Sequence, residues 1–132
     1  MRALTNEFLM KDFKKLTVYQ KAIALEDEVD EIVKTFPPIE RYRLEDQLVR
    51  AVTSIGANIA ESNGLPYVNR ERYHLTIAFG SANEVKYWVG RACRKGYINE
   101  ETCARLEEKA QEIRRIIAGM FKRFEGLRDE SA

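Results

Sequence analysis

The stretch EETCARLEEKAQEIRRIIAGMFKRFEGL, residues 100–127, carries the most regular hydrophobic pattern in the chain. Its apolar residues recur in unbroken steps of three and four, which places them along one face of an α-helix. They are Cys103, Leu106, Ala110, Ile113, Ile117, Met120, Phe124 and Leu127. Asn99 is a favourable N-cap residue, and Glu100 and Glu101 suit the positive end of a helix dipole. The stretch therefore predicts a helix over about 100–127 with one face in a core.

Three earlier segments repeat the same helical period. They predict helices over about 17–36, 41–62 and 70–95, and no strand pattern competes with them. Short connections between helices of similar length make sequential neighbours antiparallel. The sequence therefore predicts an all-α fold, an up-down-up-down antiparallel four-helix bundle that occupies residues 1–132 as one domain.

Breakers and capping residues mark the predicted helix ends. Pro37 and Pro38 end the first helix, because proline lacks a backbone donor and pushes the preceding residue out of helical geometry. Thr17 and Gln20 have the spacing of a capping box, and Asn69 is a favourable N-cap for the third helix. We therefore expect side-chain caps at the starts of the first, third and fourth helices.

Composition places the protein among folded cytoplasmic proteins. Hydrophobic residues make up 45% and charged residues 33% of the 132 residues, which favours an ordered, helix-rich domain. Cys93 and Cys103 fit neither a zinc spacing nor a disulfide framework, so we expect reduced thiols in a cytosol. The amino terminus does not read as a secretory signal, and no apolar run is long enough for a membrane span.

The third predicted helix has more apolar surface than a core requires. One stripe suffices for the core and contains Leu75, Ala78, Ala82, Val85, Val89 and Ala92. Tyr73, Ile77 and Trp88 form a second stripe about 100° away around the helix. Such a surplus indicates a partner, and another copy of the chain is the partner we expect. The alternative is a bundle core wide enough to take in both stripes.

The second predicted helix divides into three stripes. The core stripe contains Leu44, Leu48, Val52, Ile55 and Ile59. A small-residue strip, which lets another backbone approach closely, contains Val49, Thr53, Gly56 and Ala60. A polar strip stacked along one side of the helix contains Gln47, Arg50, Ser54, Asn58 and Glu61.

Two interpretations of the polar strip stay open. It forms a surface that grips a polymerase or RNA through Arg50, Asn58 and Glu61, or it forms a hydrogen-bonded network between subunits or between bundle helices. We favour the network, because polar residues among apolar neighbours usually specify register and orientation.

Nothing in the sequence indicates catalysis, a metal or a cofactor. His74 is the single histidine, and neither Ser54 nor Ser81 lies in a nucleophile elbow. Glu71 and His74 have the Glu-x-x-His spacing of di-iron bundles, but that site needs the motif on two helices. The glycines lack the lysine and spacing of a phosphate-binding loop. We therefore predict a protein that is not an enzyme.

Charge distribution raises the hypothesis of nucleic-acid binding, although the net charge is only +1. Alternating helix directions bring many basic residues to one end of the bundle, where a ring of copies would present a basic rim to phosphates. The candidate nucleic-acid-binding residues are Lys11, Lys14, Lys15, Arg70, Arg72, Lys122, Arg123 and Arg128, together with Arg50 on the polar strip. The alternative is that these cations are solvated or compensate helix dipoles.

Several blocks of sequence, taken in order, resemble one known family. The blocks are FKKLTVYQKA (13–22), FPPIERYRLEDQLVRA (36–51), SIGANIAE (54–61), IAFGSANE (77–84) and GYI (96–98). They resemble the small bacterial four-helix-bundle family first noticed in intervening sequences of 23S rRNA genes. That family is related in fold to the accessory variability proteins of diversity-generating retroelements. The chain departs from the family pattern at Tyr19, where tryptophan is usual, at Val49, which replaces an arginine, and at Ser62, where glycine is usual.

The resemblance implies a bundle that assembles into a ring, commonly of five subunits, and implies no enzymatic activity. For the retroelement relatives it also implies association with a reverse transcriptase and with nucleic acid, RNA or DNA. An odd-numbered ring needs two unlike patches, and the second stripe and the small-residue strip supply them. Together with the apolar stripes, the resemblance implies a ring-forming accessory protein. The alternative is a structural homo-oligomer with no nucleic-acid partner.

Overall fold

A computed structural model describes residues 12–64 and 66–127 of the chain, and the described residues form helices and no strand. The prediction of an all-α fold is therefore confirmed. The four long helices are α2 (Thr17–Val33), α3 (Leu44–Asn63), α4 (Val68–Arg94) and α5 (Glu100–Phe121). Three single 3₁₀ turns flank them, namely η1 (Phe13–Lys15), η2 (Pro38–Glu40) and η3 (Lys122–Phe124). Within the described ranges, no helix is long and apolar enough to cross a membrane.

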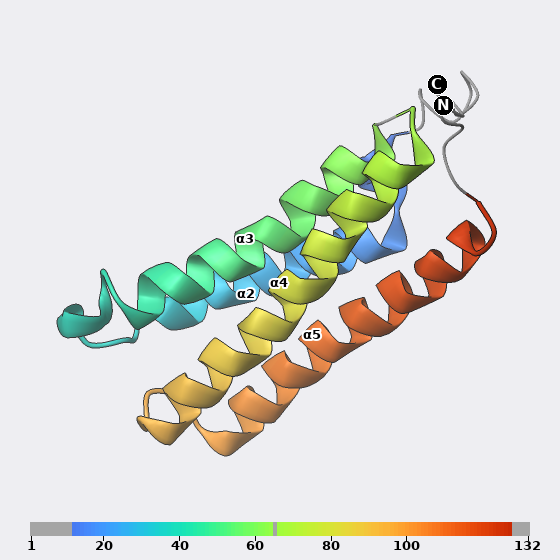
Figure 1. The fold of residues 1–132 in the computed structure, drawn as a ribbon. Helices are drawn as coiled ribbons and strands as arrows, with labels where there is room; N and C mark the ends of the chain where they lie inside the picture. The colour runs from blue at the N-terminus through green and yellow to red at the C-terminus, as the bar shows by residue number, and fades with distance from the viewer. Residues whose placement is uncertain (1–11, 65, 128–132) are drawn as a thin grey trace.

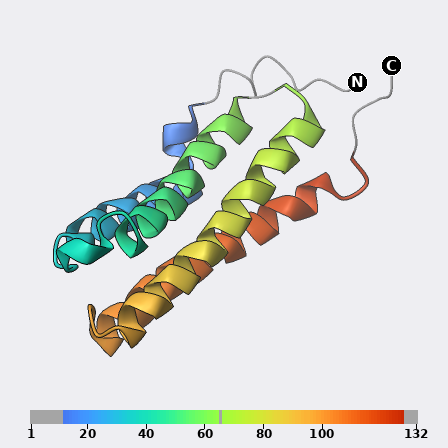
Figure 2. The ribbon, with the colours of Figure 1, turned by 60° about the vertical axis from the view of Figure 1, so that its left-hand side comes forward.

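The four helices lie side by side as an antiparallel bundle (Figures 1 and 2). Each long helix packs against two others, so that α3 contacts α2 and α4, while α5 contacts α4 and α2. The turn between α3 and α4 lies at the same end as η1 and η3, which we call the terminal end (Figure 1). The connections after α2 and after α4 lie at the opposite end, the loop end (Figure 2).

Three helix boundaries differ from the predicted ones by at least three residues. α2 ends at Val33 rather than 36, because the N–H groups of Thr35 and Phe36 bond to carbonyls three residues back and tighten the chain into a turn. α3 begins at Leu44 rather than 41, because Arg43 has a non-helical backbone (φ −124°, ψ −104°) after the turn at η2. α5 ends at Phe121 and continues as η3. In each case a turn replaces the last or first turn of the predicted helix.

Of the three predicted side-chain caps, only the one at Asn99 forms. Its side chain accepts the N–H of Thr102 at 2.8 Å, as expected of an N-cap. The capping box at Thr17 is wrong, because Thr17 is already helical and Gln20 donates to the Lys14 carbonyl instead. The cap at Asn69 is also wrong, since α4 begins at Val68.

At the C-terminal end of α4, the backbone adopts a conformation that favours glycine. Gly96 has φ +78°, a left-handed conformation that favours glycine. The N–H of Tyr97 bonds to the Ala92 carbonyl and that of Gly96 to the Cys93 carbonyl, both at 3.0 Å. This is the Schellman arrangement, which turns the chain sharply toward α5. It also brings Tyr97 to the loop end beside Phe36, with ring centroids 5.5 Å apart.

The core runs the length of the bundle and uses the stripes predicted for each helix. The core-facing residues of α3 and α4 are almost completely buried, from Leu48 and Ile55 on α3 to Leu75 and Val85 on α4. On α4 this stripe is mostly small, with Ala78, Ala82 and Ala92 fully buried. Small side chains on the contact face allow α3 and α4 to approach closely, and these two helices form the most extensive packing in the bundle.

At the terminal end, η3 is fastened to the start of α4. Phe124 is 4% exposed, and the guanidinium groups of Arg72 and Arg123 lie 5.3 and 4.9 Å from its ring centroid. Arg72 donates to the carbonyls of Phe124 (3.0 Å) and Leu127 (2.9 Å). Arg123 forms an ion pair with Glu71, whose side chain is 2% exposed. These contacts hold the segment that follows α5 against the bundle.

Substitution of Arg123 tests this attachment. Arg123→Ala leaves the buried Glu71 carboxylate without its ion-pair partner, so we expect the free energy of unfolding to fall by about 1–3 kcal/mol. Urea denaturation measures the change, and Lys122→Ala, which removes an exposed cation from the same turn, is the matched control. Glu71→Gln should recover part of the loss in the Arg123→Ala background. Equal stability of the Arg123 and Lys122 variants would contradict this account.

Candidate functional site

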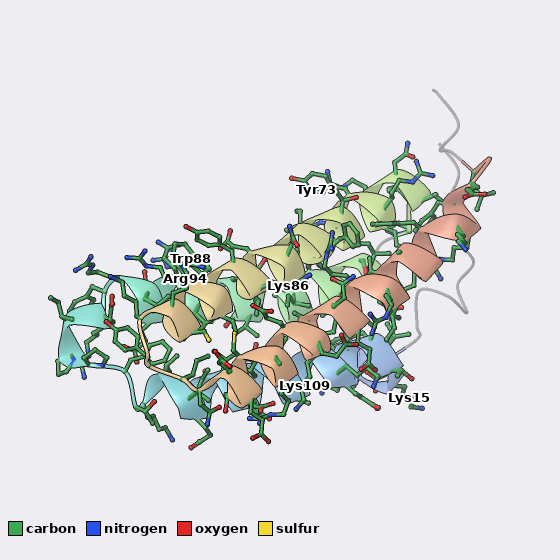
Figure 3. All side chains as sticks on the ribbon, turned by 90° about the horizontal axis from the view of Figure 1, so that it is seen from below. Lys15, Tyr73, Lys86, Trp88, Arg94 and Lys109 are labelled. Atoms are coloured by element: carbon green, nitrogen blue, oxygen red, sulfur yellow. The ribbon has the colours of Figure 1, made fainter. Side chains whose placement is uncertain are left out.

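Aromatic residues gather on the outer side of α4. Tyr73 and Tyr87 are 58% and 57% exposed, while Ile77 and Trp88 are half-buried. The core stripe of the same helix is fully buried, so the core of one chain does not take in Tyr73. Figure 3 shows Tyr73 toward the terminal end of α4 and Trp88 toward the loop end. The predicted second stripe is therefore present on the surface but divides into two halves.

The middle of the polar strip joins α3 to α4. Asn58 donates to the Ser54 carbonyl at 2.9 Å, and its Oδ1 lies 2.9 Å from His74 Nδ1. Because an amide oxygen only accepts, Nδ1 of His74 carries the proton. Ser81 donates to the Ser54 hydroxyl at 2.8 Å. This arrangement corresponds to one of the two interpretations of the strip, a hydrogen-bonded network between bundle helices.

The other members of the polar strip lie outside this network. Arg50 forms an exposed ion pair with Asp46 at 3.0 Å, and Glu61 is exposed near the end of α3. Gln47 lies nearer the loop end, where it lines a pocket described below. The strip is therefore three local environments rather than one surface.

The small-residue strip lies on the side of α3 that faces α2. A Cβ atom added at Gly56 would lie 3.4 Å from Ile23 Cδ1 and 3.9 Å from Tyr19 Cε1 of the same chain. Gly56 is thus buried inside the bundle, where it allows α2 to approach. Around it, Val49 and Ala60 are half-buried and Thr53 is exposed.

A pocket of about 270 Å³ lies between α3 and α4 at the loop end. Its cationic and aromatic walls are Arg43, Arg91, Tyr87 and Trp88, and Leu44, Gln47 and Glu40 complete it. The indole N–H of Trp88 donates to Glu84 Oε2 at 3.3 Å, and the rings of Tyr87 and Trp88 meet edge to face at 4.8 Å. The pocket therefore combines two arginines with an aromatic ring held in one orientation.

Glu40, in the wall of this pocket, is a buried carboxylate with its own partners. Tyr97 donates its hydroxyl to Glu40 Oε2 at 2.7 Å and joins the two loops of this end. This hydrogen bond, the Leu44 N–H, and the charges of Arg43 and Arg91 lower the pKa of Glu40, although burial opposes the shift. The same hydrogen bond raises the pKa of Tyr97.

The sequence patterns assigned none of these residues to a binding pocket. Leu44, Gln47 and Trp88 were assigned to three different stripes on two helices. Arg91 lies three residues after Trp88 and therefore on the same helical face, a signal that sequence alone contains. Glu40 and Arg43 come from a connection whose position depends on the fold.

The predicted basic end is brought together only in part. Lys14, Lys15, Arg70 and Lys122 are exposed at the terminal end, and Figure 3 shows Lys15 far from Trp88. Arg72 and Arg123 are engaged in the contacts of η3, and Arg50 lies on α3 away from this end. Lys11 and Arg128 lie outside the described residues.

Within the described ranges, no group of His, Cys, Asp and Glu side chains is arranged to hold a metal ion. Cys103 is buried and its thiol lies 3.6 Å from Glu107 Oε1. Burial, together with neighbouring Cys93 and Glu107, raises the pKa of the Cys103 thiol to about 12. The thiol therefore stays protonated at neutral pH and is a poor nucleophile.

These features define an antiparallel four-helix bundle with aromatic and cationic residues on the outer side of α4. The chain belongs to the family of 23S rRNA-intervening sequence proteins, whose family model matches residues 14–119. It is also similar to a crystal structure of a protein with unknown function from the S23 ribosomal protein family of Bacteroides thetaiotaomicron. The two share 26% sequence identity and a TM-score of 0.75, over 80% of this chain and 99% of that chain. No curated protein matches the chain.

The link between Tyr97 and Glu40 predicts a change in pH dependence. A carboxylate with a lowered pKa stabilises the fold above its unfolded pKa, and this contribution is lost as pH falls through the folded pKa. Tyr97→Phe removes the first cause of the shift, so the loss of stability between about pH 7 and pH 3 should become smaller. Urea midpoints at the two pH values measure it, with Tyr42→Phe, at an 85% exposed tyrosine, as control. An unchanged difference between the midpoints would contradict the assignment.

Proposed function

We propose that the protein is a non-enzymatic accessory protein that self-associates into a ring and binds nucleic acid at the ends of that ring. The observation that carries self-association is the exposed Tyr73 beside the half-buried Ile77 on α4. An aromatic and a β-branched side chain on one helix face gain most when a second protein surface removes them from water. Another copy of the chain is the proposed partner.

The polar network beside this patch supports a defined contact. Asn58, Ser54 and His74 are held in fixed positions next to Tyr73, whose ring meets His74 edge to face at 5.3 Å. A patch with a rigid polar border favours one orientation of the incoming surface. A ring also needs an unlike second patch, and Thr53 with Val49 on the α2 side of α3 offers one without aromatic side chains.

Exposed cations support the nucleic-acid part of the proposal. Among the described residues, the side chains of Lys14, Lys15, Arg70 and Lys122 form no ion pair, and all four belong to the terminal end. A ring would repeat this set around its rim, and neutralised phosphates would release counterions. RNA is the proposed nucleic acid, and a reverse transcriptase is the protein partner suggested by the resemblance to accessory variability proteins. A structural homo-oligomer without nucleic acid is the alternative.

Self-association is tested at Tyr73 and Ile77. We expect the wild-type chain to sediment as an oligomer and the double variant Tyr73→Glu/Ile77→Glu to sediment as a single chain at micromolar concentration. Loss of two apolar contacts and burial of charge should raise the dissociation constant at least about tenfold. Sedimentation velocity measures the assembly, and circular dichroism verifies the helical content.

The matched control places the same two substitutions on the loop after α2. Ile39→Glu/Tyr42→Glu changes residues that are 67% and 85% exposed and leaves α4 intact, so the assembly should persist. A wild-type protein that is a single chain at micromolar concentration would end the proposal. Dissociation of the control alone would move the interface to the loop end.

Nucleic-acid binding is tested with two cations of the terminal end. Lys15→Gln/Arg70→Gln should weaken binding of single-stranded RNA and reduce the dependence of log Kobs on log salt by about 0.7 for each lost contact. A mobility-shift series against salt measures both quantities. The control Lys34→Gln/Arg115→Gln removes the same charge from two surface ion pairs and should bind like wild type. Equal effects of the two variants, or no binding near physiological salt, would refute this part.

A further inference from the structure

The pocket at the loop end has the composition of a ligand site, and neither self-association nor the cations of the terminal end use it. Two arginines reach it from different elements, Arg43 before the first turn of α3 and Arg91 from the last turns of α4. Guanidinium groups present forked donors that match the oxygens of a phosphate. The pocket therefore offers an anion two such forks within one cavity of about 270 Å³.

The carboxylate in the wall does not cancel this attraction. Oε2 of Glu40 accepts the hydroxyl of Tyr97, and the Leu44 N–H also bonds to this carboxylate. Arg43 approaches Glu40 only at 3.9 Å and keeps a side chain that is 60% exposed. The lining thus carries two guanidinium groups against the one carboxylate of Glu40, an excess of one positive charge.

Trp88 supplies a flat surface in the same cavity. Its ring is half-buried and is fixed by the hydrogen bond to Glu84 and by the edge-to-face contact with Tyr87. A fixed indole is a stacking platform for a flat heterocycle, and every nucleobase has such a face. Gln47, in the same wall, offers an amide donor and acceptor to the polar edge of a base.

We propose that this pocket binds a nucleoside phosphate, with the phosphate on Arg43 and Arg91 and the base against Trp88. A free mononucleotide and a single residue of an RNA strand share this chemistry. An anion without an aromatic ring would contact only the arginines, and an aromatic ring without an anionic group would contact only Trp88. The site lies at the loop end, away from Tyr73 and Lys15 (Figure 3). It is also distant from Arg70, which lies in the first turn of α4. The site therefore does not depend on any of these residues.

Trp88 is the single tryptophan of the chain, so its fluorescence reports directly on the pocket. Titration with adenosine 5′-monophosphate should quench the emission saturably, and adenosine without phosphate should bind at least about tenfold more weakly. A tetramer of riboadenylate distinguishes the sources. Saturation by the tetramer alone assigns the site to a strand, and equal saturation by both assigns it to a nucleotide unit in either form.

Variants of the two walls complete the test. Arg91→Gln should weaken the mononucleotide or tetramer that binds by about tenfold, while Arg94→Gln, a cation whose guanidinium lies near Gly90 and outside the pocket lining, should not. By calorimetry, Trp88→Phe should retain more binding than Trp88→Ala.

Three results would overturn the proposal. They are no saturable quenching by nucleotide or tetramer, equal binding with and without phosphate, and quenching only by a tryptophan-free acidic peptide. If one of these results is obtained while the wild-type chain still assembles through Tyr73 and binds RNA through Lys15 and Arg70, the pocket proposal fails and the proposed function stands.

Discussion

Close packing between α3 and α4 is the constraint on which the rest of the molecule depends. α4 lines the core with Ala78, Ala82 and Ala92, so its backbone lies near α3 and leaves little room between them. Protein interiors are packed at nearly crystalline density, so large aromatic rings do not fit between two closely packed helices. The exposed aromatic residues Tyr73 and Tyr87 consequently lie on the outer side of α4, whereas Phe79 packs toward α5 against Phe121. The exposed aromatic surface of α4 thus follows from the small residues on its inner face.

Two buried glutamates, Glu71 and Glu40, stabilise the two ends of the interface between α3 and α4. At the terminal end, Glu71 in the first turn of α4 pairs with Arg123 of η3. At the loop end, Glu40 accepts from Tyr97, which the Schellman turn after α4 brings into place. A buried carboxylate is tolerated only where hydrogen-bond donors surround it. Each glutamate therefore holds a segment that is distant in sequence against the interface between α3 and α4. The pocket beside Glu40 therefore has walls held by long-range bonds.

Hydrophobic periodicity was sufficient to predict the four helices and their core faces, because burial of a stripe acts over many residues at once. Individual caps were less predictable, since the choice of Leu16 over Thr17, or Tyr67 over Asn69, rests on how the preceding chain approaches the helix. Arg72 was expected on a basic rim, but the carbonyls it binds lie more than fifty residues away in sequence. Contacts of that kind, and the meeting of Glu40 with Tyr97, depend on the assembled fold.

The division of the outer face of α4 has a consequence for how its two halves work together. Tyr73 lies beside the network of Asn58 and His74, whereas Trp88 lies beside Arg91 and Gln47. Between them the helix presents Gly80 and Ser81, which add little apolar surface. A partner subunit seated on the first half therefore need not cover the second. In a ring of such subunits every copy would keep its pocket open, and the pockets would recur at the spacing of the subunits, a geometry that suits a repeating polyanion better than a solitary small molecule.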